Sequence, residues 1–248
     1  MAIPKIIHYC WFGRNPLPEL AQKCIASWRN FLPDYEIKEW NEDNFDVNTI
    51  PYTAEAYKVK KYAFVSDYAR FWILYHEGGL YFDTDVEIIA NMDAIVARGP
   101  FMGIEQGASF DGKPMVAPGL GLGAEAGHAF FKRMLQVYND QIFINADGSY
   151  NNMTIVTYTT QELYYRGMKP SENIQEVEGI WIYPADYFCP MDSTTGIITK
   201  TSRTVAIHHY DCSWMNHNSV SFRLHQMKNA FYKLIGQRNA QLINKILH

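Results

Sequence analysis

Two aspartates one residue apart, Asp83 and Asp85, directly follow the short apolar run 80–82. Residues two apart in a strand point to the same face, so both carboxylates can reach one ion or two oxygen atoms of one ligand. Magnesium and manganese prefer oxygen ligands, and they commonly take one or two carboxylates together with substrate phosphates. The pair therefore predicts a site for a hard divalent cation. The alternative is an ordinary surface turn built from Asp and Thr.

A second pair of charged residues, Asp67 and Arg70, precedes the aspartates in a segment with helical periodicity. A spacing of three residues puts both side chains on one face of a helix. Gly78 and Gly79 are expected to end that helix, because glycine readily adopts the left-handed conformation of a C-cap. Alone, such a pair predicts a surface ion pair worth ~0–1 kcal/mol. The sequence motif that contains Asp67 and Arg70, described next, favours a functional role for the pair.

The stretch 63–87 resembles the sugar-transferase motif of glycosyltransferase family 32. It reads AFVSDYAR and, after a spacer of seven residues, GGLYFDTDVE, so that several fixed residue types fall at fixed separations. The family includes yeast-type mannosyltransferases and bacterial capsule and lipopolysaccharide enzymes. The glucosyltransferase domains of large clostridial toxins carry the same pattern. The opening segment 6–13, IIHYCWFG, supports the resemblance, and 208–214, HHYDCSW, adds a less close match.

The resemblance implies a role for each polar residue of the motif. Asp85 is expected to bind a metal directly, and Asp83 to contact the metal or the ribose of a nucleotide. Tyr81 is expected to lie beside the nucleotide. Asp67 is expected to bind hydroxyl groups of the donor sugar, and Arg70 to bind sugar or diphosphate oxygens. Apart from the tyrosine, these are the expected catalytic residues. Mn²⁺ or Mg²⁺ would act as a Lewis acid on the diphosphate leaving group.

The two ends of the chain supply further expected donor contacts. Trp11 is expected to pack on the base of the donor, although a tryptophan at this point of a buried strand is also a candidate for the core. A late loop of the family commonly adds a metal ligand and then a tryptophan near the diphosphate. His209, with Ser213 and Trp214 after it, fits that description. His208 competes with His209, and strand alternation lets only one of them face the site; His209 is preferred.

The implied function is metal-dependent transfer of a hexose, with retention of configuration, from a nucleotide-sugar (a UDP-sugar) to a carbohydrate or glycolipid acceptor. Synthesis of bacterial surface polysaccharide is the expected setting. A phosphohydrolase with an aspartate nucleophile is one alternative, but Glu87 stands where such enzymes have threonine. A cation-dependent carbohydrate-binding protein is another. It gives no reason for Asp67, Arg70 and Tyr81 to accompany the aspartates.

Composition narrows the class of protein. The net charge of −4 gives no electrostatic case for nucleic-acid binding. Four scattered cysteines without a Cys-x-x-Cys pair argue against a zinc ribbon or a thioredoxin-like site. We expect a cytoplasmic protein, because the sequence shows neither a leader pattern nor an apolar stretch of about 18 residues. The segment 212–248 contains basic residues and no Asp or Glu. We expect it to dock on the domain, and contact with an anionic membrane is the alternative.

The elements that position these residues follow from periodicity and from Gly and Pro. A strand over 5–11, a helix over about 20–31 and a strand over 35–40 form a β-α-β opening. Helical segments follow from 54 and from Ser66 or Asp67, and strands are expected at 80–82, 86–90 and 101–105. A helix over 126–138 and short strands near 155, 174, 180 and 205 complete the pattern.

The glycine-rich run 119–123 lacks the Lys and Ser or Thr of a phosphate loop, so it predicts part of an irregular loop over 103–123 on the acceptor side. Further cleft candidates, which no spacing ranks, are Glu105, Gln106, Asn151, Asn152 and Thr154. The fold class is α/β. The resemblance implies a GT-A-like, mostly parallel sheet flanked by helices. One domain over 1–248 is expected, with the tail 222–248 as helix docked on it.

Overall fold

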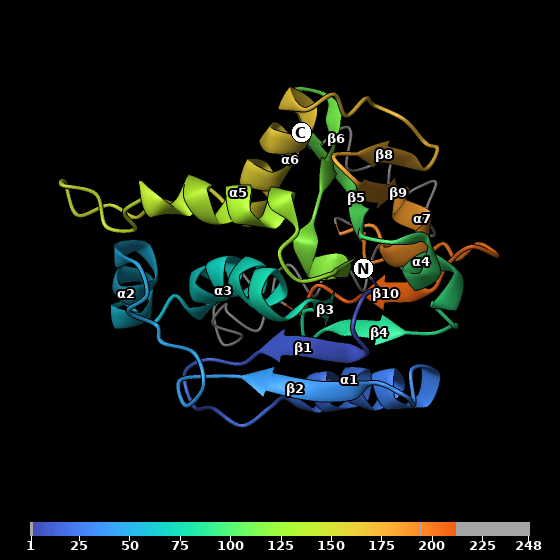
Figure 1. The fold of residues 1–248 in the computed structure, drawn as a ribbon, viewed down its shortest axis with the longest axis horizontal. Coiled ribbons are helices and arrows are strands. Elements are labelled where there is room, and N and C mark those ends of the chain that lie inside the picture. Colours follow the sequence, from blue (N-terminus) through green and yellow to red (C-terminus); the bar gives the residue numbers. More distant parts are fainter. Residues whose placement is uncertain (1, 194, 212–248) are drawn as a thin grey trace.

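An eight-stranded mixed sheet forms the centre of the molecule (Figure 1). The structure is a computed structural model that describes residues 2–193 and 195–211. The strand order is β2-β1-β3-β7-β5-β9-β8, with β6 paired to β5, and a separate two-stranded sheet joins β4 to β10. The strands are β1 (Ile6–Cys10), β2 (Glu36–Trp40), β3 (Gly79–Tyr81), β4 (Val86–Ile88), β5 (Phe101–Phe110), β6 (Lys113–Val116), β7 (Leu122–Ala124), β8 (Gln175–Val177), β9 (Ile180–Tyr183) and β10 (Ala206–His208).

Five strands of the central sheet run in one direction. β1 is parallel to β2 and to β3, and β5 is parallel to β9. Since β3 and β5 are both antiparallel to β7 between them, they too run the same way. The carboxyl ends of β1, β2, β3, β5 and β9 therefore meet at one edge of the sheet, where open α/β sheets bind ligands. The predicted fold class, a mostly parallel sheet flanked by helices, is confirmed.

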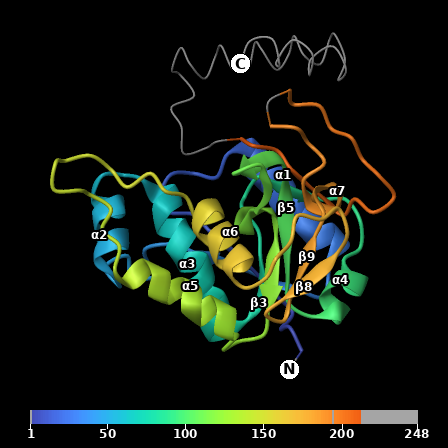
Figure 2. The same ribbon diagram turned by 90° about the horizontal axis from the view of Figure 1, so that it is seen from above.

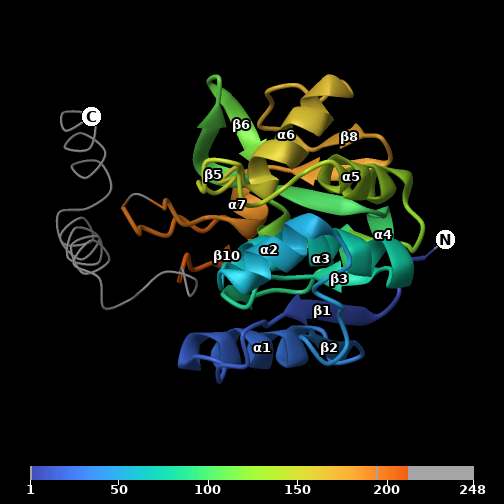
Figure 3. The same cartoon turned by 90° about the vertical axis from the view of Figure 1, so that its left-hand side faces the viewer.

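Helices cover both faces of the sheet (Figure 2). One face carries α2 (Pro51–Lys58), α3 (Tyr62–Glu77), α5 (Ala129–Asn139) and α6 (Ile155–Tyr165). The other carries α1 (Glu19–Phe31), α4 (Asp93–Arg98) and α7 (Ala185–Phe188). Side chains of β3 alternate between the two cores. Leu80 packs with Trp28 of α1, whereas Tyr81 packs with Phe71 of α3. The view in Figure 3 shows the sheet from β2 at one edge to β8 at the other.

A buried histidine joins the start of the sheet to the end of α3. His8 is fully buried, accepts the indole N–H of Trp40 at Nδ1 over 3.0 Å, and lies 2.9 Å from the Gly78 carbonyl through Nε2. These two partners require a neutral ring with its proton on Nε2. Burial lowers the pKa of His8 to about 4, against the smaller opposing effect of the Gly78 carbonyl. The ring thereby fixes the turn from which the Asp83 strand begins.

Several predicted elements differ from the structure. The β-branched residues around Ile155 predicted a strand, but they begin helix α6, because Ile155, Tyr158, Thr159 and Leu163 share one buried face at helical spacing. Most of the predicted loop 103–123 is the β5–β6 hairpin and β7. Helix α3 starts at Tyr62, so Asp67 lies inside it instead of at its N-cap. The predicted helical tail 222–248 lies outside the described residues. Within the described ranges, no helix is both long and apolar enough to span a membrane.

Candidate active site

A cavity of about 750 Å³ opens at the carboxyl ends of the parallel strands. It has the size of an ordinary small-molecule site. Its lining comes from segments far apart in the sequence: the loop after β1, helix α3, the turn after β3, the 3₁₀ turn η1 (Pro118–Leu120), the start of α6 and the chain after β10. Trp11, Asp67, Arg70, Asp83 and Asp85 are all among the lining residues. The fold thus brings five of the predicted site residues together.

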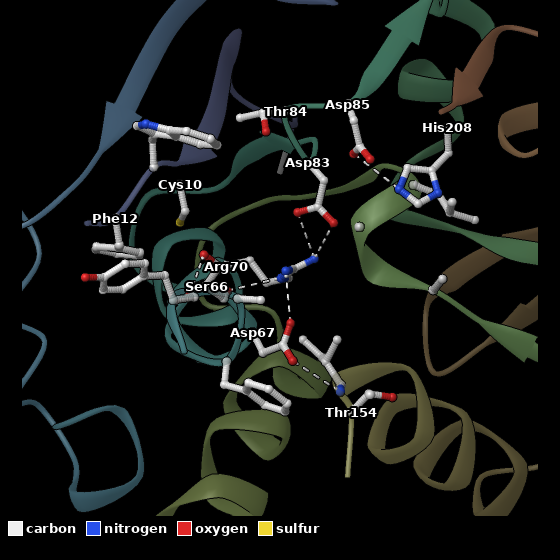
Figure 4. Close-up of a pocket in the computed structure, with 18 of the residues that line it drawn as sticks. Cys10, Phe12, Ser66, Asp67, Arg70, Asp83, Thr84, Asp85, Thr154 and His208 are labelled. Carbon is white, nitrogen blue, oxygen red and sulfur yellow. Dashed lines mark hydrogen bonds and ion pairs between the residues drawn. The ribbon is translucent and has the colours of Figure 1, made fainter. Parts of the chain in front are cut away.

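Arg70 is the hub of the cavity (Figure 4). Its Nη2 donates to Asp67 Oδ1 over 3.0 Å, and its Nη1 donates to Asp83 Oδ2 over 3.2 Å. Its Nε donates to the Ser66 carbonyl over 3.1 Å, which fixes the guanidinium group against the backbone of helix α3. Only 5% of the side chain is exposed. A buried, charge-assisted arrangement of this kind is the opposite of the surface ion pair considered from the sequence.

Burial also changes the acidity of Asp67. Desolvation raises the pKa of Asp67 to about 6, against the attraction of Arg70 and with further repulsion from Asp83. The second oxygen of this carboxylate accepts the backbone N–H of Ile155, the first residue of α6, over 3.4 Å. Asp67 therefore ties helix α3 to the start of α6 at the floor of the cavity.

Asp85 forms a second ion pair. Its Oδ1 lies 3.2 Å from Nε2 of His208, and its Oδ2 accepts the backbone N–H of Asp211 over 2.9 Å. Burial by itself raises the pKa of Asp85, but the charge and hydrogen bond of His208 lower it by more, so the pKa is about 2. Burial likewise lowers the pKa of His208, yet the Asp85 carboxylate raises it well above the usual value. Asp85 is therefore ionised, and the His208 ring is its side-chain partner.

Comparison with known proteins shows what part of this arrangement is similar to. Residues 18–102 match the family described as a glycosyltransferase sugar-binding region containing a DXD motif. Asp83-Thr84-Asp85 is the D-x-D sequence within that segment. The chain is therefore similar to DXD glycosyltransferases over this segment.

Its relatives differ in how much of the chain they match. An uncharacterized glycosyltransferase, L373, of Acanthamoeba polyphaga mimivirus is 26% identical over 219 residues, which cover 81% of this chain and 82% of the relative. Inositol phosphoceramide mannosyltransferase 1 of Schizosaccharomyces pombe is 28% identical over 111 residues, covering 40% of this chain and 33% of the yeast protein. Inositol phosphoceramide mannosyltransferase 3 of the same yeast is 33% identical over 99 residues, covering 38% and 28%. The match thus spans about a third of the yeast proteins.

Two solved structures are also similar. A glycosyltransferase involved in the glycosylation of the major capsid of PBCV-1 is 11% identical, with a TM-score of 0.49 over 93% of this chain and all of that one. The PaToxG glycosyltransferase is 17% identical, with a TM-score of 0.47 over 66% of this chain and 69% of its own.

The structure alters the preference between the two histidines. The ring of His208 faces the cavity and Asp85, whereas Nε2 of His209 lies 2.9 Å from Glu87 Oε2. His209 reaches Asp85 only through its backbone N–H, which donates to the Asp85 carbonyl over 3.0 Å. Alternation does send the two rings to different partners, but the predicted phase was reversed. Ser213 and Trp214 lie outside the described residues.

Tyr81 also has a different position from the one expected. Its side chain is buried and does not line the cavity. Its hydroxyl donates to Asp83 Oδ1 over 3.2 Å, and its ring lies under the Arg70 guanidinium, 4.9 Å from the ring centre to Cζ. Tyr81 therefore supports the Arg70–Asp83 pair from behind instead of facing the space for a nucleotide.

The predicted ligand trio Asp83, Asp85 and His209 is not assembled. Asp83 is turned to Arg70, and His209 to Glu87. No group of three or more His, Cys, Asp or Glu in residues 2–193 and 195–211 is placed to hold a metal ion. Among the described lining residues, Asp85 and His208 are a carboxylate and an imidazole that lie side by side. A carboxylate and an imidazole suit Mn²⁺, and Mg²⁺ and Mn²⁺ sites commonly complete their coordination with diphosphate and water oxygens.

Gly119, at η1, is a positioning residue that the sequence did not reveal. Its carbonyl accepts the backbone N–H of Asp83 over 3.0 Å, and its Cα faces the carboxylate of that residue. A Cβ built at this position would lie 2.9 Å from Asp83 Cγ and 3.1 Å from Arg70 Nη1. The alternate glycines of 119–123 were the available signal: Gly121 faces Phe82, and Gly123 faces Leu80. The run comprises the end of η1 and the start of β7, and its glycines face the segment that leads into the DXD sequence.

Proposed function

We propose that this chain is a metal-dependent glycosyltransferase that moves a hexose from a nucleotide-sugar to a hydroxyl group of a carbohydrate or glycolipid. The observation that carries the proposal is the pair of ion-paired groups in one cavity. Arg70 lies between Asp67 and Asp83, and Asp85 lies against His208. This arrangement offers one fixed cation, one metal-binding carboxylate and hydrogen-bond acceptors within a single donor-sized space.

Each residue has a separate task in this proposal. Arg70 binds diphosphate or sugar oxygens of the donor. Its guanidinium N–H groups would form these hydrogen bonds in place of some of those they form with Asp67 and Asp83. Asp67 accepts hydrogen bonds from hydroxyl groups of the donor sugar, and its burial gives these bonds a low-dielectric setting. Trp11, at the end of β1, lines the cavity and offers its ring to the base.

Asp85 and His208 would hold Mn²⁺ or Mg²⁺, and Asp83 would bind the ribose or the ion. The ion supplies Lewis-acid stabilisation of the charge that develops on the leaving diphosphate. The buried setting strengthens every electrostatic contact within the site. Positioning and charge stabilisation would then account for most of the rate.

Retention of configuration, a UDP-sugar donor and a role in bacterial surface polysaccharide are the finer parts of the proposal, and they rest on the resemblance of 63–87 to family 32. A cytoplasmic location is proposed with them. The yeast relatives are named for mannosyl transfer to inositol phosphoceramide, so GDP-mannose belongs in any donor panel with the UDP-hexoses.

The test is release of nucleotide from a panel of UDP- and GDP-sugars with Mn²⁺ or Mg²⁺, with and without a chelator. Turnover that disappears on chelation is expected for at least one donor. Asp85→Ala should abolish it while the thermal unfolding curve keeps its cooperative shape. Asp34→Ala, which removes an exposed carboxylate paired with Lys5, is the matched control and should keep full activity. Neither turnover nor metal-dependent nucleotide binding across the panel would refute the proposal.

A further inference from the structure

Glu105 differs from the other carboxylates that line the cavity. Asp67 and Asp83 share Arg70, and Asp85 is paired with His208. Glu105 lines the same cavity, but within the described part of the chain no Lys, Arg or His side chain forms an ion pair with it. Among the described residues, its carboxylate therefore has no cationic side chain as a partner and can accept a hydrogen bond from a neutral donor.

The strand geometry aims Glu105 at the ligand edge of the sheet. β5 runs parallel to β3, so the two strands leave the core at the same edge. Residues 101–104 are buried, and Glu105 is the first residue of β5 beyond them. Pairing of β5 with β6 also changes register between Ile104 and Ser109. Irregular pairing of this kind commonly redirects a side chain next to an active site.

Tyr210 and Glu105 line the same cavity. Burial, and then Cys189 and Glu105, raise the pKa of Tyr210, whose hydroxyl lies 3.0 Å from Cys189 Sγ. Its ring lies 4.3 Å from that of His208, which places Glu105 on the His208 side of the cavity. Tyr210 has a φ of 52°, a left-handed conformation that is costly for a bulky residue and that often marks a functional constraint. Tyr210 is therefore a neutral neighbour of the carboxylate.

We propose that Glu105 is the acceptor-binding carboxylate, and that it accepts the hydrogen bond of the hydroxyl group that attacks the donor sugar. The inference rests on the proposed function. Figure 4 shows Asp83 and Arg70 between the Phe12 side of the cavity and the His208 side. Trp11 belongs to the Phe12 side through the loop after β1. A donor whose base lies at Trp11 and whose diphosphate lies at Asp85 leaves the Glu105 end for the acceptor.

The chemical step balances without an added reagent. The acceptor oxygen forms a bond to carbon 1 of the hexose, and the bond from carbon 1 to the diphosphate oxygen breaks with its electron pair on that oxygen. The proton of the acceptor passes to the departing diphosphate. Glu105 holds the acceptor O–H so that a lone pair of its oxygen points at carbon 1, which is a gain from orientation. When no carbohydrate is present, water takes the same position.

Hydrolysis of the donor therefore tests Glu105 without knowledge of the natural acceptor. Glu105→Gln and Glu105→Ala would be compared with wild type for kcat of Mn²⁺-dependent UDP-sugar or GDP-sugar hydrolysis, and for the Kd of the product nucleotide with Mn²⁺ by calorimetry. We expect kcat to fall roughly 10-fold or more, since misplacement of a reacting group costs up to about 100-fold. The nucleotide Kd should stay within about twofold, because Glu105 acts on the acceptor in this proposal. A tenfold change in Kd would require 1.4 kcal/mol.

Two further variants complete the experiment. Tyr210→Phe should lower kcat by a smaller factor than Glu105→Ala, because it removes only the hydroxyl group of a neutral neighbour of the carboxylate. Glu176→Gln, the same chemical change at an exposed site on β8, should change neither quantity. Thermal unfolding would confirm that each variant is folded.

The outcomes separate this inference from the proposed function. An unchanged kcat in both Glu105 variants would overturn the acceptor role. A nucleotide Kd that weakens as much as kcat falls would also overturn it, because Glu105 would then act on the donor. Failure of the wild type to bind or hydrolyse any nucleotide-sugar would instead refute the proposed function, and the acceptor role with it.

Discussion

Replacement of Gly119 by alanine should displace the Asp83 carboxylate without touching it chemically. The backbone of Gly119 is not in the left-handed region, so alanine brings only its methyl group and no backbone strain. That Cβ would stand 2.9 Å from Asp83 Cγ, whereas ordinary contacts of Cβ atoms begin at 3.4 Å. The Oδ2 atom of Asp83 would lie closer still, so the carboxylate must withdraw by more than the difference of about 0.5 Å between these two distances.

The withdrawal affects two hydrogen bonds. Asp83 accepts from Arg70 and from Tyr81, each over 3.2 Å, so an extra half ångström in either brings that contact beyond hydrogen-bond range. Hydrogen bonds to charged groups contribute about 1.5–3 kcal/mol. Asp83 is 32% exposed, so water recovers part of this. We expect a loss of about 1–2 kcal/mol in the free energy of unfolding, or a fall of about 2–8 °C in Tm.

A double-mutant cycle measured by urea unfolding isolates the contact. In an Asp83→Ala background the carboxylate is gone, so Gly119→Ala should change stability by less than about 0.5 kcal/mol. Gly103→Ala, whose Cβ meets only Phe188, is the control and should cost the same in both backgrounds. An equal loss from Gly119→Ala with and without Asp83 would refute the reasoning. In the wild-type background, weaker binding of nucleotide and Mn²⁺ should accompany the loss of stability.

Two further predictions concern histidines. The pKa of His8 is about 4 in the folded protein and about 6.5 in the unfolded chain. Below pH 6.5 the unfolded chain therefore binds more protons than the folded protein, and the free energy of unfolding falls. His8 accounts for about 2 kcal/mol of that loss at pH 5. His8→Asn should therefore reduce the difference between the free energies of unfolding in urea at pH 7 and pH 5 by about that amount. An unchanged difference would show that folded His8 accepts a proton freely. His208→Ala should raise the Mn²⁺ concentration for half-maximal turnover roughly 10-fold or more, and His209→Ala by less than about twofold. The reverse order would show that the ring paired with Glu87 is the ligand.

Local patterns predicted the elements whose information lies within a few neighbouring residues. The β-α-β opening, the stop of α3 at Gly78 and the strand that leads into Asp83 all appear as expected. In each case a short periodicity or a glycine was sufficient. Helix α6 was missed for the opposite reason, because the residues that bury Ile155 come from distant parts of the chain and override the local preference. The β5–β6 hairpin pairs residues close in sequence, such as Phe110 with Lys113, and was missed because the glycines and prolines of 103–123 predicted an irregular loop.

The site divides in the same way. The sequence by itself predicted that Asp67, Arg70, Asp83 and Asp85 form one site, because their types and spacing match a known motif within one continuous stretch. Only the tertiary structure decided how they are used. It paired Asp83 with Arg70 and Asp85 with His208, and it set Gly119 and Glu105 beside them. Such choices depend on which strand ends meet at the edge of the sheet, and contacts across more than a hundred residues, such as that of Asp85 with Asp211, are not encoded in any local pattern.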